Sequence, residues 1–401
     1  MDVLVTASAH FAITSDGMLW TPNQSLDYHF WSRYLDVYDE VKILARAKPY
    51  QLPPSGWNQA SGPGIKAIPL PDYQGGSGLV RNYTHIKKTA IAALANTKAV
   101  QMRLSCDIGA IVWRCLASSR PYGIEVVNDP YDVFAPGAYK HPLRAIFRRW
   151  STWQLQRHTA NATAAAYVTE YSLQKRYPPK NGAFSTYFSS IDLPNSAFAA
   201  APREPRTGIK SFTLISVGTL AQLYKAPDVL IKAIAICVQE GLDIQLIWVG
   251  DGKYKSELQT LAAEKGINKR VTFGGYLSTR DQVIEQLDQG DLFVLPSYQE
   301  GLPKAMIEAM ARGLPCIGSN VGGIPELLPE EDMVNPGCHI ALAHKIREVV
   351  TNPYRLATMS ISNLEKAKNY REDILQKRRI KFYNHVKEQT QTWLSSQTKS
   401  F

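Results

Sequence analysis

Short apolar runs alternate with segments of helical spacing along most of the chain, and this alternation constrains the fold more than any other feature. In the C-terminal half the runs are FTLISVG (212–218), DIQLIWVGDG (243–252), VTFGGY (271–276), DLFVLPS (291–297) and LPCIGS (314–319). Helical segments separate them, near 227–239, 253–265, 280–288, 304–312 and 340–351. This βα order predicts a parallel sheet covered by helices on both faces.

The N-terminal half shows the same alternation less regularly. Its predicted strands are VLVTA near the start, KAVQMRL (98–104), GIEVV (123–127) and AAAYVTE (164–170), with helices predicted at 84–97 and 108–119. MDVLVTASAHF lacks a basic leader and a small-residue cleavage site, so we expect a buried first strand there. Residues 48–78 are rich in Pro and Gly and predict a loop that contains one strand, IKAIPL.

The length of 401 residues exceeds one ordinary core and predicts two domains. Residues 197–210, AFAAAPREPRTGIK, have the composition of a linker, so we predict an N-terminal domain over 1–200 and a C-terminal domain over 201–375. The five cysteines are scattered and show no C-x-x-C spacing, which argues against a disulfide framework or a zinc site and for a reducing compartment.

The net charge of +10 is uneven, because residues 1–200 carry 20 Lys and Arg against 13 Asp and Glu. One segment, HPLRAIFRRWSTWQLQRH (141–158), contains no acidic residue. Basic and aromatic residues on one helix suit an anionic membrane surface, although aromatic residues facing the core and arginines facing water are an equal alternative. The predicted surface residues are Arg144, Arg148, Arg149 and Trp150. No apolar run is long enough to span a membrane.

The most informative segment is PSYQEGLPKAMIEAMARGLPCIGSNVGGIPELL (296–328). A strand ends at Leu295, and a loop then places Glu300 at the start of a helix that begins near Pro303, where Pro is well tolerated. The unpaired amides and dipole of a helix N-terminus suit a pyrophosphate. Glu308 lies one to two turns further along this helix. The two carboxylates can therefore bind hydroxyl groups on either side of a phosphate.

A second segment, SVGTLAQLYKAPD (216–228), places Gly218 at a strand end and Lys225 shortly after it. A cation in this position can hold a diphosphate. The alternative is that Lys225 is a solvated lysine at the start of a helix.

The spacing Glu300-x7-Glu308, within P-S-x-x-E-G-x-P and followed by VGGIPEL, resembles the signature of glycosyltransferase family 4. SVGTL, KAPDVLIKA, VGDG and VTFGGY also fall in the order of that family over 210–350, and the resemblance is weaker over 1–200. It implies a GT-B fold of the α/β class, with two Rossmann-like doubly wound domains facing an interdomain cleft. It also implies that a C-terminal helix over 376–401 crosses back to the N-terminal domain.

The resemblance also assigns roles to residues. Glu300 would contact the hydroxyls of the transferred sugar and Glu308 those of the ribose. Thr219 stands where the family commonly has Arg, so Lys225 and a hydroxyl would hold the leaving diphosphate. The other implied donor-binding residues are Gly218, Gly275, Gly301, Leu302 and Lys304.

Three residues of the N-terminal half complete the predicted site. Gly17, in SDGMLW, falls where the glycine loop of the family approaches the donor phosphates, but it lacks the double Gly and a plain turn is the alternative. Asn128 and Asp129 stand where many relatives carry His–Asp, and either can hydrogen-bond the sugar or the acceptor. Asp129-x-x-Asp132 is a poor metal motif, and GT-B transferases generally work without metal, so no metal is predicted.

The resemblance implies retaining transfer of a hexosyl group from a nucleotide-diphosphate sugar to a hydroxyl of a glycan or lipid-linked acceptor, in polysaccharide or glycolipid assembly. A UDP-sugar is the favoured donor, and no bound cofactor is expected. We expect a cytoplasmic protein that contacts the inner face of the membrane peripherally. A nucleotide-sugar epimerase shares this architecture, but the Glu300/Glu308 segment does not resemble that group. Nucleic-acid binding is disfavoured because the charge is diffuse and no aromatic-rich motif accompanies it.

Overall fold

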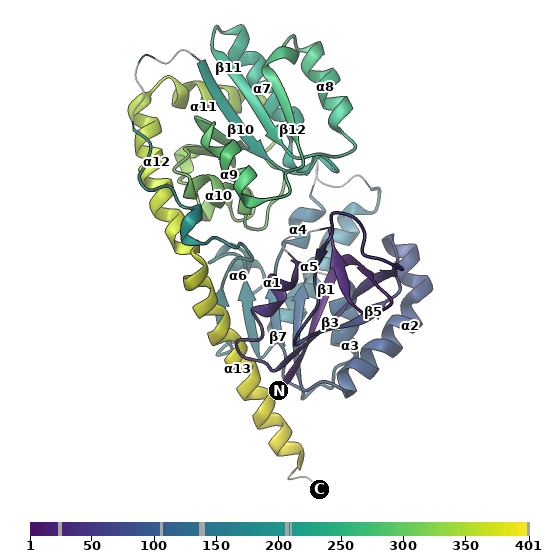
Figure 1. Ribbon diagram of the computed structural model, residues 1–401. Helices are drawn as coiled ribbons and strands as arrows, with labels where there is room; N and C mark the ends of the chain where they lie inside the picture. Colours follow the sequence, from purple (N-terminus) through teal and green to yellow (C-terminus); the bar gives the residue numbers. More distant parts are fainter. Residues whose placement is uncertain (23–25, 105–106, 136–140, 205–207, 209–210, 399–401) are drawn as a thin grey trace. The chain divides into compact units, whose positions relative to one another are not determined.

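The computed structural model forms two compact units (Figure 1). Unit 1 comprises residues 1–129, 150–190 and 373–401, and unit 2 comprises residues 130–149 and 191–372. The structure describes the whole chain apart from residues 23–25, 105–106, 136–140, 205–207, 209–210 and 399–401. Part of the predicted linker 197–210 therefore lies outside the described residues, and the predicted domain limits stay predictions.

Unit 2 is built on a parallel sheet of six strands in the order β12-β11-β10-β13-β14-β15. The strands are β10 (Ser211–Val217), β11 (Asp243–Val249), β12 (Val271–Gly275), β13 (Leu292–Leu295), β14 (Cys316–Ser319) and β15 (Met333–Val334). The first five were predicted. The strand order is that of a doubly wound nucleotide-binding sheet, which reverses direction between β10 and β13. Ligands of such sheets bind at the carboxyl ends of the strands beside that reversal.

The helices of unit 2 follow the predicted order. They are α4 (Pro130–Val133), α7 (Pro227–Gln239), α8 (Lys255–Glu264), α9 (Arg280–Asp288), α10 (Lys304–Ala311), α11 (His339–Val350) and α12 (Pro353–Ala367). The five helices predicted between 227 and 351 are confirmed, with ends within two residues. One core cluster joins apolar residues of α7, α8 and α11 to the sheet, including Trp248 and Leu214, which are fully buried. Burial of these helix faces holds the sheet and its loops in place.

Unit 1 has seven parallel strands in the order β5-β3-β1-β6-β7-β8-β9, which reverses between β1 and β6. They are β1 (Asp2–Ile13), β3 (Glu40–Pro49), β5 (Ile65–Leu70), β6 (Ala99–Leu104), β7 (Gly123–Val126), β8 (Ala164–Tyr167) and β9 (Phe184–Tyr187). Two short strands add antiparallel pairs to the sheet: β2 (Leu19–Thr21) pairs with the last two residues of β1, and β4 (Asn58–Gln59) pairs with β2.

The sequence prediction was incomplete in unit 1. It missed β3, because Lys42, Arg46 and Lys48 interrupt its apolar run; the ammonium of Lys42 bonds to the Asp2 carboxylate at 2.6 Å. It also began the first long helix too late, since α2 spans Gly75–Ala95. The glycines of its first turn have low helix propensity, so the sequence did not indicate that the helix begins there. The remaining helices of this unit are α1 (Tyr28–Ser32), α3 (Asp107–Cys115), α6 (Ser172–Arg176) and most of α13 (Glu372–Thr398).

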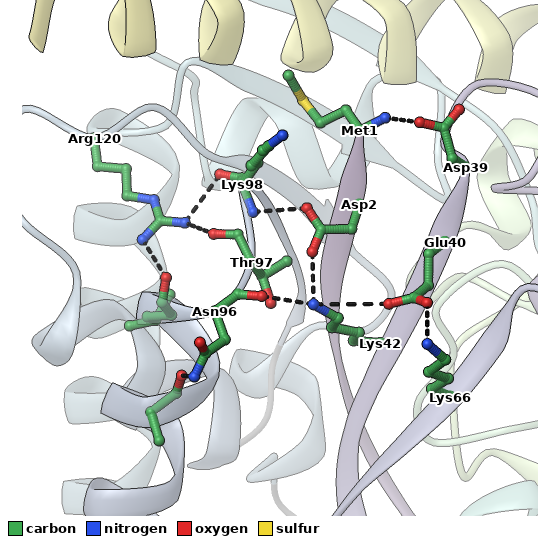
Figure 2. Close-up of polar contacts among 12 residues, drawn as sticks. Met1, Asp2, Asp39, Glu40, Lys42, Lys66, Asn96, Thr97, Lys98 and Arg120 are labelled. Carbon is green, nitrogen blue, oxygen red and sulfur yellow. Dashed lines mark hydrogen bonds and ion pairs between the residues drawn. The ribbon is translucent and has the colours of Figure 1, made fainter. Parts of the chain in front are cut away.

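A polar network closes the amino ends of the central strands of unit 1 (Figure 2). Asp2 of β1 accepts a hydrogen bond from the backbone N–H of Lys98 at 3.0 Å, and Lys42 of β3 also donates to the Asn96 carbonyl at 2.6 Å. Arg120 donates to the carbonyls of Leu94 and Lys98. These contacts hold together the edge of the sheet at which its strands begin. The loops that follow the strands lie at the opposite edge.

The long helix α13 packs against the sheet of unit 1. Tyr383 of α13 stacks on Tyr34 with ring centres 4.5 Å apart, and the Tyr34 hydroxyl donates to the Glu125 carboxylate at 2.6 Å. Gly123 at the start of β7 lies directly beneath the helix. A Cβ atom there would be 2.8 Å from Cγ2 of Val386 and 3.1 Å from Cζ of Phe382. The absence of a side chain at Gly123 therefore sets the distance between α13 and the sheet.

We expect Gly123→Ala to lower the free energy of unfolding by about 1–3 kcal/mol, because the added methyl overpacks this contact. Chemical denaturation of purified protein measures the loss. Gly76→Ala is the matched control, since a Cβ in the first turn of α2 meets no atom within 4 Å and should be neutral or slightly stabilising. Adding Val386→Ala should recover part of the loss. A Gly123→Ala protein as stable as the native one would contradict this packing.

Candidate functional site

The loops that follow β10 and β13 meet at the carboxyl edge of the sheet of unit 2. Lys225 and Glu300 are 75 residues apart in the chain, yet Nζ of Lys225 lies 2.7 Å from Oε1 of Glu300. Both side chains are largely buried, at 13% and 6% exposed. Because β10 pairs directly with β13, the loops after the two strands leave the sheet side by side. The structure thus brings together the two predicted residues from separate motifs.

One serine binds the Glu300 carboxylate, and a second serine binds the backbone of the first. Neither was predicted from the sequence. The hydroxyl of Ser297 donates to Oε1 of Glu300 at 2.6 Å, so this oxygen accepts from both Ser297 and Lys225. The hydroxyl of Ser319, at the end of β14, donates to the Ser297 carbonyl. Both serines are fully buried. In the sequence, each of these serines stands at or just after the end of an apolar run, and this position could have indicated them.

The position of Lys225 depends on a tight turn between β10 and α7. Lys225 ends a short 3-10 helix, and Ala226 then adopts a left-handed conformation with φ of 52°. The amide of Tyr298 donates to the Tyr224 carbonyl at 2.8 Å and ties this turn to the loop after β13. A Cβ on Gly218 would lie 3.0 Å from Cγ of Lys225. Gly218 therefore leaves room for the lysine side chain.

The loop after β11 packs closely on Gly218. The indole N–H of Trp248 donates to the Gly218 carbonyl at 2.9 Å, and a Cβ on Gly250 would lie only 2.1 Å from that oxygen. Gly250 also donates to the carbonyl of Gly275, the last residue of β12, at 2.7 Å. Thr219 is exposed, and its hydroxyl accepts from the amide of Ala221 at 3.1 Å. The predicted residues Gly218, Thr219 and Gly275 therefore lie at the carboxyl ends of β10 and β12, on the same edge of the sheet.

Helix α10 begins directly after Glu300, Gly301 and Leu302. Its N-cap residue is Pro303, one position earlier than the first-turn placement that the sequence suggested, and no side chain caps its amides. The Gly323 amide donates to the Gly301 carbonyl at 2.6 Å. Gly322 has φ of +54°, and a Cβ there would lie 1.9 Å from the Glu300 carbonyl oxygen. The double glycine therefore permits a backbone contact that fixes the start of α10.

Glu308 lies on the second turn of α10 and is partly buried. Burial raises the pKa of its carboxyl above the ordinary value of 4.5, and the positive charges of Lys304 and Arg280 act in the opposite direction. Within the described residues its carboxylate makes no hydrogen bond or ion pair. A desolvated carboxylate with unused acceptor positions is costly, and it suits the hydroxyl donors of a ligand.

The predicted residues of unit 1 lie in two places. Gly17, with φ of +82°, closes the turn that joins β1 to β2, where its amide donates to the Thr14 carbonyl at 2.8 Å. Asp129 is buried and accepts hydrogen bonds from the guanidinium of Arg176 and the hydroxyl of Tyr177. Asn128 directly precedes it. The Asp129 carboxylate thus already serves unit 1, and its role and that of Asn128 towards a substrate stay predictions.

The four predicted membrane-surface residues differ in their surroundings. They lie on α5 (Arg144–Ala160), one continuous helix. Arg144 donates to the Phe134 carbonyl at 2.9 Å, and Arg148 donates to the Tyr131 carbonyl at 2.7 Å and lies over the Tyr131 ring. Arg149 and Trp150 are exposed. The first two arginines therefore hold the segment around α4, whereas the other two face outwards.

The described residues offer neither a cluster of metal ligands nor a membrane-spanning helix. No group of three or more His, Cys, Asp or Glu side chains in this part of the chain could hold a metal ion. Across the same residues, no helix has the length and apolar character needed to cross a membrane. Cys115, Cys237, Cys316 and Cys338 are free thiols, and Cys106 lies outside the described residues. The absence of a metal requirement stays a prediction.

We expect Lys225→Met to lower the free energy of unfolding by about 3 kcal/mol, because the Glu300 carboxylate would stay buried with only Ser297 as a partner. The double variant Lys225→Met/Glu300→Gln should recover much of this loss. Lys232→Met is the matched control: Lys232 pairs with Asp228 at 3.2 Å on the more exposed surface of α7, and its loss should cost less than about 1 kcal/mol. Equal losses for the two lysines, measured by denaturant unfolding, would contradict a special role for the Lys225–Glu300 pair.

We expect Glu308→Gln to stabilise the ligand-free protein at neutral pH. Because burial raises the folded-state pKa of Glu308, the native protein loses stability as pH rises from the ordinary carboxyl value through the raised one. The variant lacks this loss, and its advantage should vanish at pH values below 4.5, where the carboxyl is protonated in both states. Thermal unfolding across pH measures the effect. Glu257→Gln, in the exposed first turn of α8, is the control, and an advantage independent of pH would refute the argument.

Comparison with known proteins shows which family the C-terminal part of the chain resembles. Residues 201–373 match the model of glycosyl transferases group 1. Protein CapJ of Staphylococcus aureus is 25% identical over 336 residues, which cover 82% of each chain. Other relatives match over shorter stretches: one is 38% identical over 119 residues, and the chain spans 30% of its length.

Solved structures share the fold at low sequence identity. Sucrose-phosphate synthase from Thermosynechococcus elongatus superposes with a TM-score of 0.71 at 15% identity, covering 96% of this chain and 98% of that one. Anabaena HepE in complex with UDP-glucose gives a TM-score of 0.62 at 16% identity, covering 99% and 100%. The predicted GT-B fold is thereby confirmed. The comparisons support a glycosyltransferase of the group 1 type. The match to the model of that family covers residues 201–373.

Proposed function

We propose that the protein is a retaining glycosyltransferase that binds a nucleotide-diphosphate sugar at the carboxyl edge of the sheet of unit 2. It transfers the hexosyl group to a hydroxyl of a glycan or lipid-linked acceptor, in polysaccharide or glycolipid assembly. The observation that carries this proposal is the meeting of Lys225 and Glu300 beside the start of α10, with the unpartnered Glu308 carboxylate on the same helix. The Lys225 ammonium and the N-terminus of α10 suit the diphosphate of such a donor. The two carboxylates suit the hydroxyls of its sugar and its ribose.

The Lys225–Glu300 pair suggests how the donor is received. Without a donor, the ammonium of Lys225 neutralises Glu300. A diphosphate adds negative charge beside Lys225 and competes for the ammonium, and the backbone amides of Gly301, Leu302 and Lys304 add favourable dipoles. The Glu300 oxygens then become available to the hydroxyls of the sugar. Binding thus exchanges an internal ion pair for contacts with the donor.

The transfer step follows from this arrangement. The bond between the anomeric carbon and the diphosphate oxygen breaks, and its electron pair goes to the diphosphate. That oxygen takes the proton of the incoming acceptor hydroxyl, whose oxygen bonds to the anomeric carbon on the face that the diphosphate leaves. The configuration is retained. Lys225 stabilises the charge of the departing diphosphate, and catalysis consists mainly of positioning and electrostatic stabilisation. No metal is required in this scheme.

Glu308 is proposed to accept hydrogen bonds from the ribose diol, a feature common to ribonucleoside diphosphates. A UDP-sugar is the first donor to test, since the HepE structure that shares this fold was solved with UDP-glucose. The acceptor is assigned to the N-terminal half of the chain, because the basic excess over residues 1–200 favours an anionic partner. We place the reaction in the cytoplasm.

The test uses Glu308→Gln with UDP and UDP-glucose. A charge-assisted hydrogen bond contributes about 1.5–3 kcal/mol and a neutral one about 0.5–1.5 kcal/mol, so affinity measured by calorimetry should fall roughly fivefold to tenfold for each bond that changes. The same variant should be more stable than the native protein without nucleotide, so loss of binding cannot be attributed to unfolding. Glu257→Gln is the control and should bind like the native protein.

Two outcomes would overturn the proposal. The native protein might show no thermal shift with any nucleotide or nucleotide sugar in a donor screen, although a tight ligand stabilises a fold measurably. Alternatively, Glu308→Gln might bind UDP as well as the native protein does, which would leave Glu308 as a helix residue only. Release of nucleoside diphosphate that requires an acceptor glycan distinguishes transfer from epimerisation.

A further inference from the structure

One face of α5 carries large apolar side chains that are exposed to solvent. Ile146 is 61% exposed, Trp150 50% and Trp153 51%, and Leu143, just before the helix, is 49% exposed. These residues are spaced three or four positions apart, so they form one stripe along a single helix. We call these four residues the α5 stripe.

The α5 stripe is a concentration and not a scatter of single residues. Among the described residues fifteen large apolar side chains are exposed, and four of them fall within residues 143–153. Single exposed apolar residues are normal on a protein surface, whereas contiguous ones mark an interaction site. Two of the four are tryptophans, which favour surroundings that are apolar on one side and polar on the other.

Positive charge flanks the α5 stripe. Arg149 is exposed beside Trp150, and Arg157 is exposed one turn after Trp153, with its guanidinium 4.9 Å from the centre of a Trp153 ring. No Asp or Glu occurs anywhere in residues 133–169. This segment of the chain therefore joins apolar and cationic side chains without an acidic residue among them, which is the pattern of helices that lie in the interface of an anionic bilayer.

We propose that the α5 stripe docks on an anionic lipid bilayer. Trp150, Trp153 and Ile146 enter the boundary between headgroups and acyl chains, and Arg149 and Arg157 contact lipid phosphates. The charge argues for this occupant over a second copy of the chain, because two copies meeting through α5 would bring these arginines against one another. The inference rests on this surface alone and is independent of the donor site.

Arg144 and Arg148 take no part in this docking surface. Their guanidinium groups are held by the carbonyls of Phe134 and Tyr131. Replacing them would disturb the packing around α4, so a loss of lipid binding in such variants would have two explanations. Arg149 and Arg157 are the informative arginines.

The first test measures co-sedimentation of the full chain with vesicles of equal parts phosphatidylcholine and phosphatidylglycerol. The native protein should bind these and bind pure phosphatidylcholine more weakly. Arg149→Gln/Arg157→Gln should lower partitioning by about fivefold for each arginine removed. Lys87→Gln/Lys88→Gln removes two exposed charges from α2 and should have little effect.

The second test concerns the apolar side chains. Trp150→Ser/Trp153→Ser should lower partitioning by at least about tenfold, because burial of tryptophan dominates interfacial binding. Tyr354→Ser/Ile361→Ser removes two exposed apolar side chains from α12 and is the matched control. Thermal unfolding of each variant confirms that it is folded.

Quenching by brominated lipid gives a readout that survives if the serine variant fails to fold. Tryptophan fluorescence of the native protein should be quenched, and Trp150→Phe/Trp153→Phe should still bind vesicles but lose most of the quenching. Three results would overturn the proposal: native protein that ignores the mixed vesicles, quenching unchanged in the phenylalanine variant, or a stripe variant that changes only the oligomeric state in sedimentation velocity.

Discussion

The direct pairing of β10 with β13 is the constraint on which the site of unit 2 depends. Leu214 pairs with Leu292 and Ile215 with Phe293, so the strand order reverses at this point and two loops leave the sheet together. One loop carries Lys225 and the other carries Glu300. Without this register, two side chains 75 residues apart would have no reason to form a buried ion pair. The core beneath, formed by α7, α8 and α11 on the sheet, holds the register in place.

Close backbone approach is the second requirement of the site. The loop after β11 lies against the loop after β10 at Gly250 and Gly218, and the loop after β14 lies against the loop after β13 at Gly322 and Glu300, at distances that only glycine permits. Such contacts fix the start of α10 without side-chain caps. The N-cap residue Pro303 contributes no side-chain hydrogen bond to the first turn of the helix. Desolvation raises the pKa of the Glu308 carboxyl in the ligand-free protein, and the hydroxyl donors of the proposed ligand would offset this cost.

The arginines of the chain have two different kinds of surroundings, and this affects how surface charge is interpreted. Arg176 pairs with buried Asp129, and Arg144 and Arg148 bond to backbone carbonyls, so all three serve local structure. Arg149 and Arg157 face solvent beside exposed tryptophans. The net charge of a segment therefore does not show which of its arginines are available to a partner. The contacts of each guanidinium group in the structure show that.

The sequence by itself determined the class of the fold, most elements of unit 2 and the segment that carries the candidate site. Apolar runs and helical spacing are local properties, and Glu300-x7-Glu308 places two carboxylates around one helix start through local geometry alone. Tertiary structure decided what depends on distant partners. β3 is a strand because β1 and β5 pair with it, although its basic residues break the apolar pattern. The Lys225–Glu300 contact, the support from Ser297 and Ser319, and the engagement of Asp129 by Arg176 all join residues that no periodicity relates. Exposure is likewise a property of the packed chain, so only the structure could separate Arg149 and Trp150 from Arg144 and Arg148.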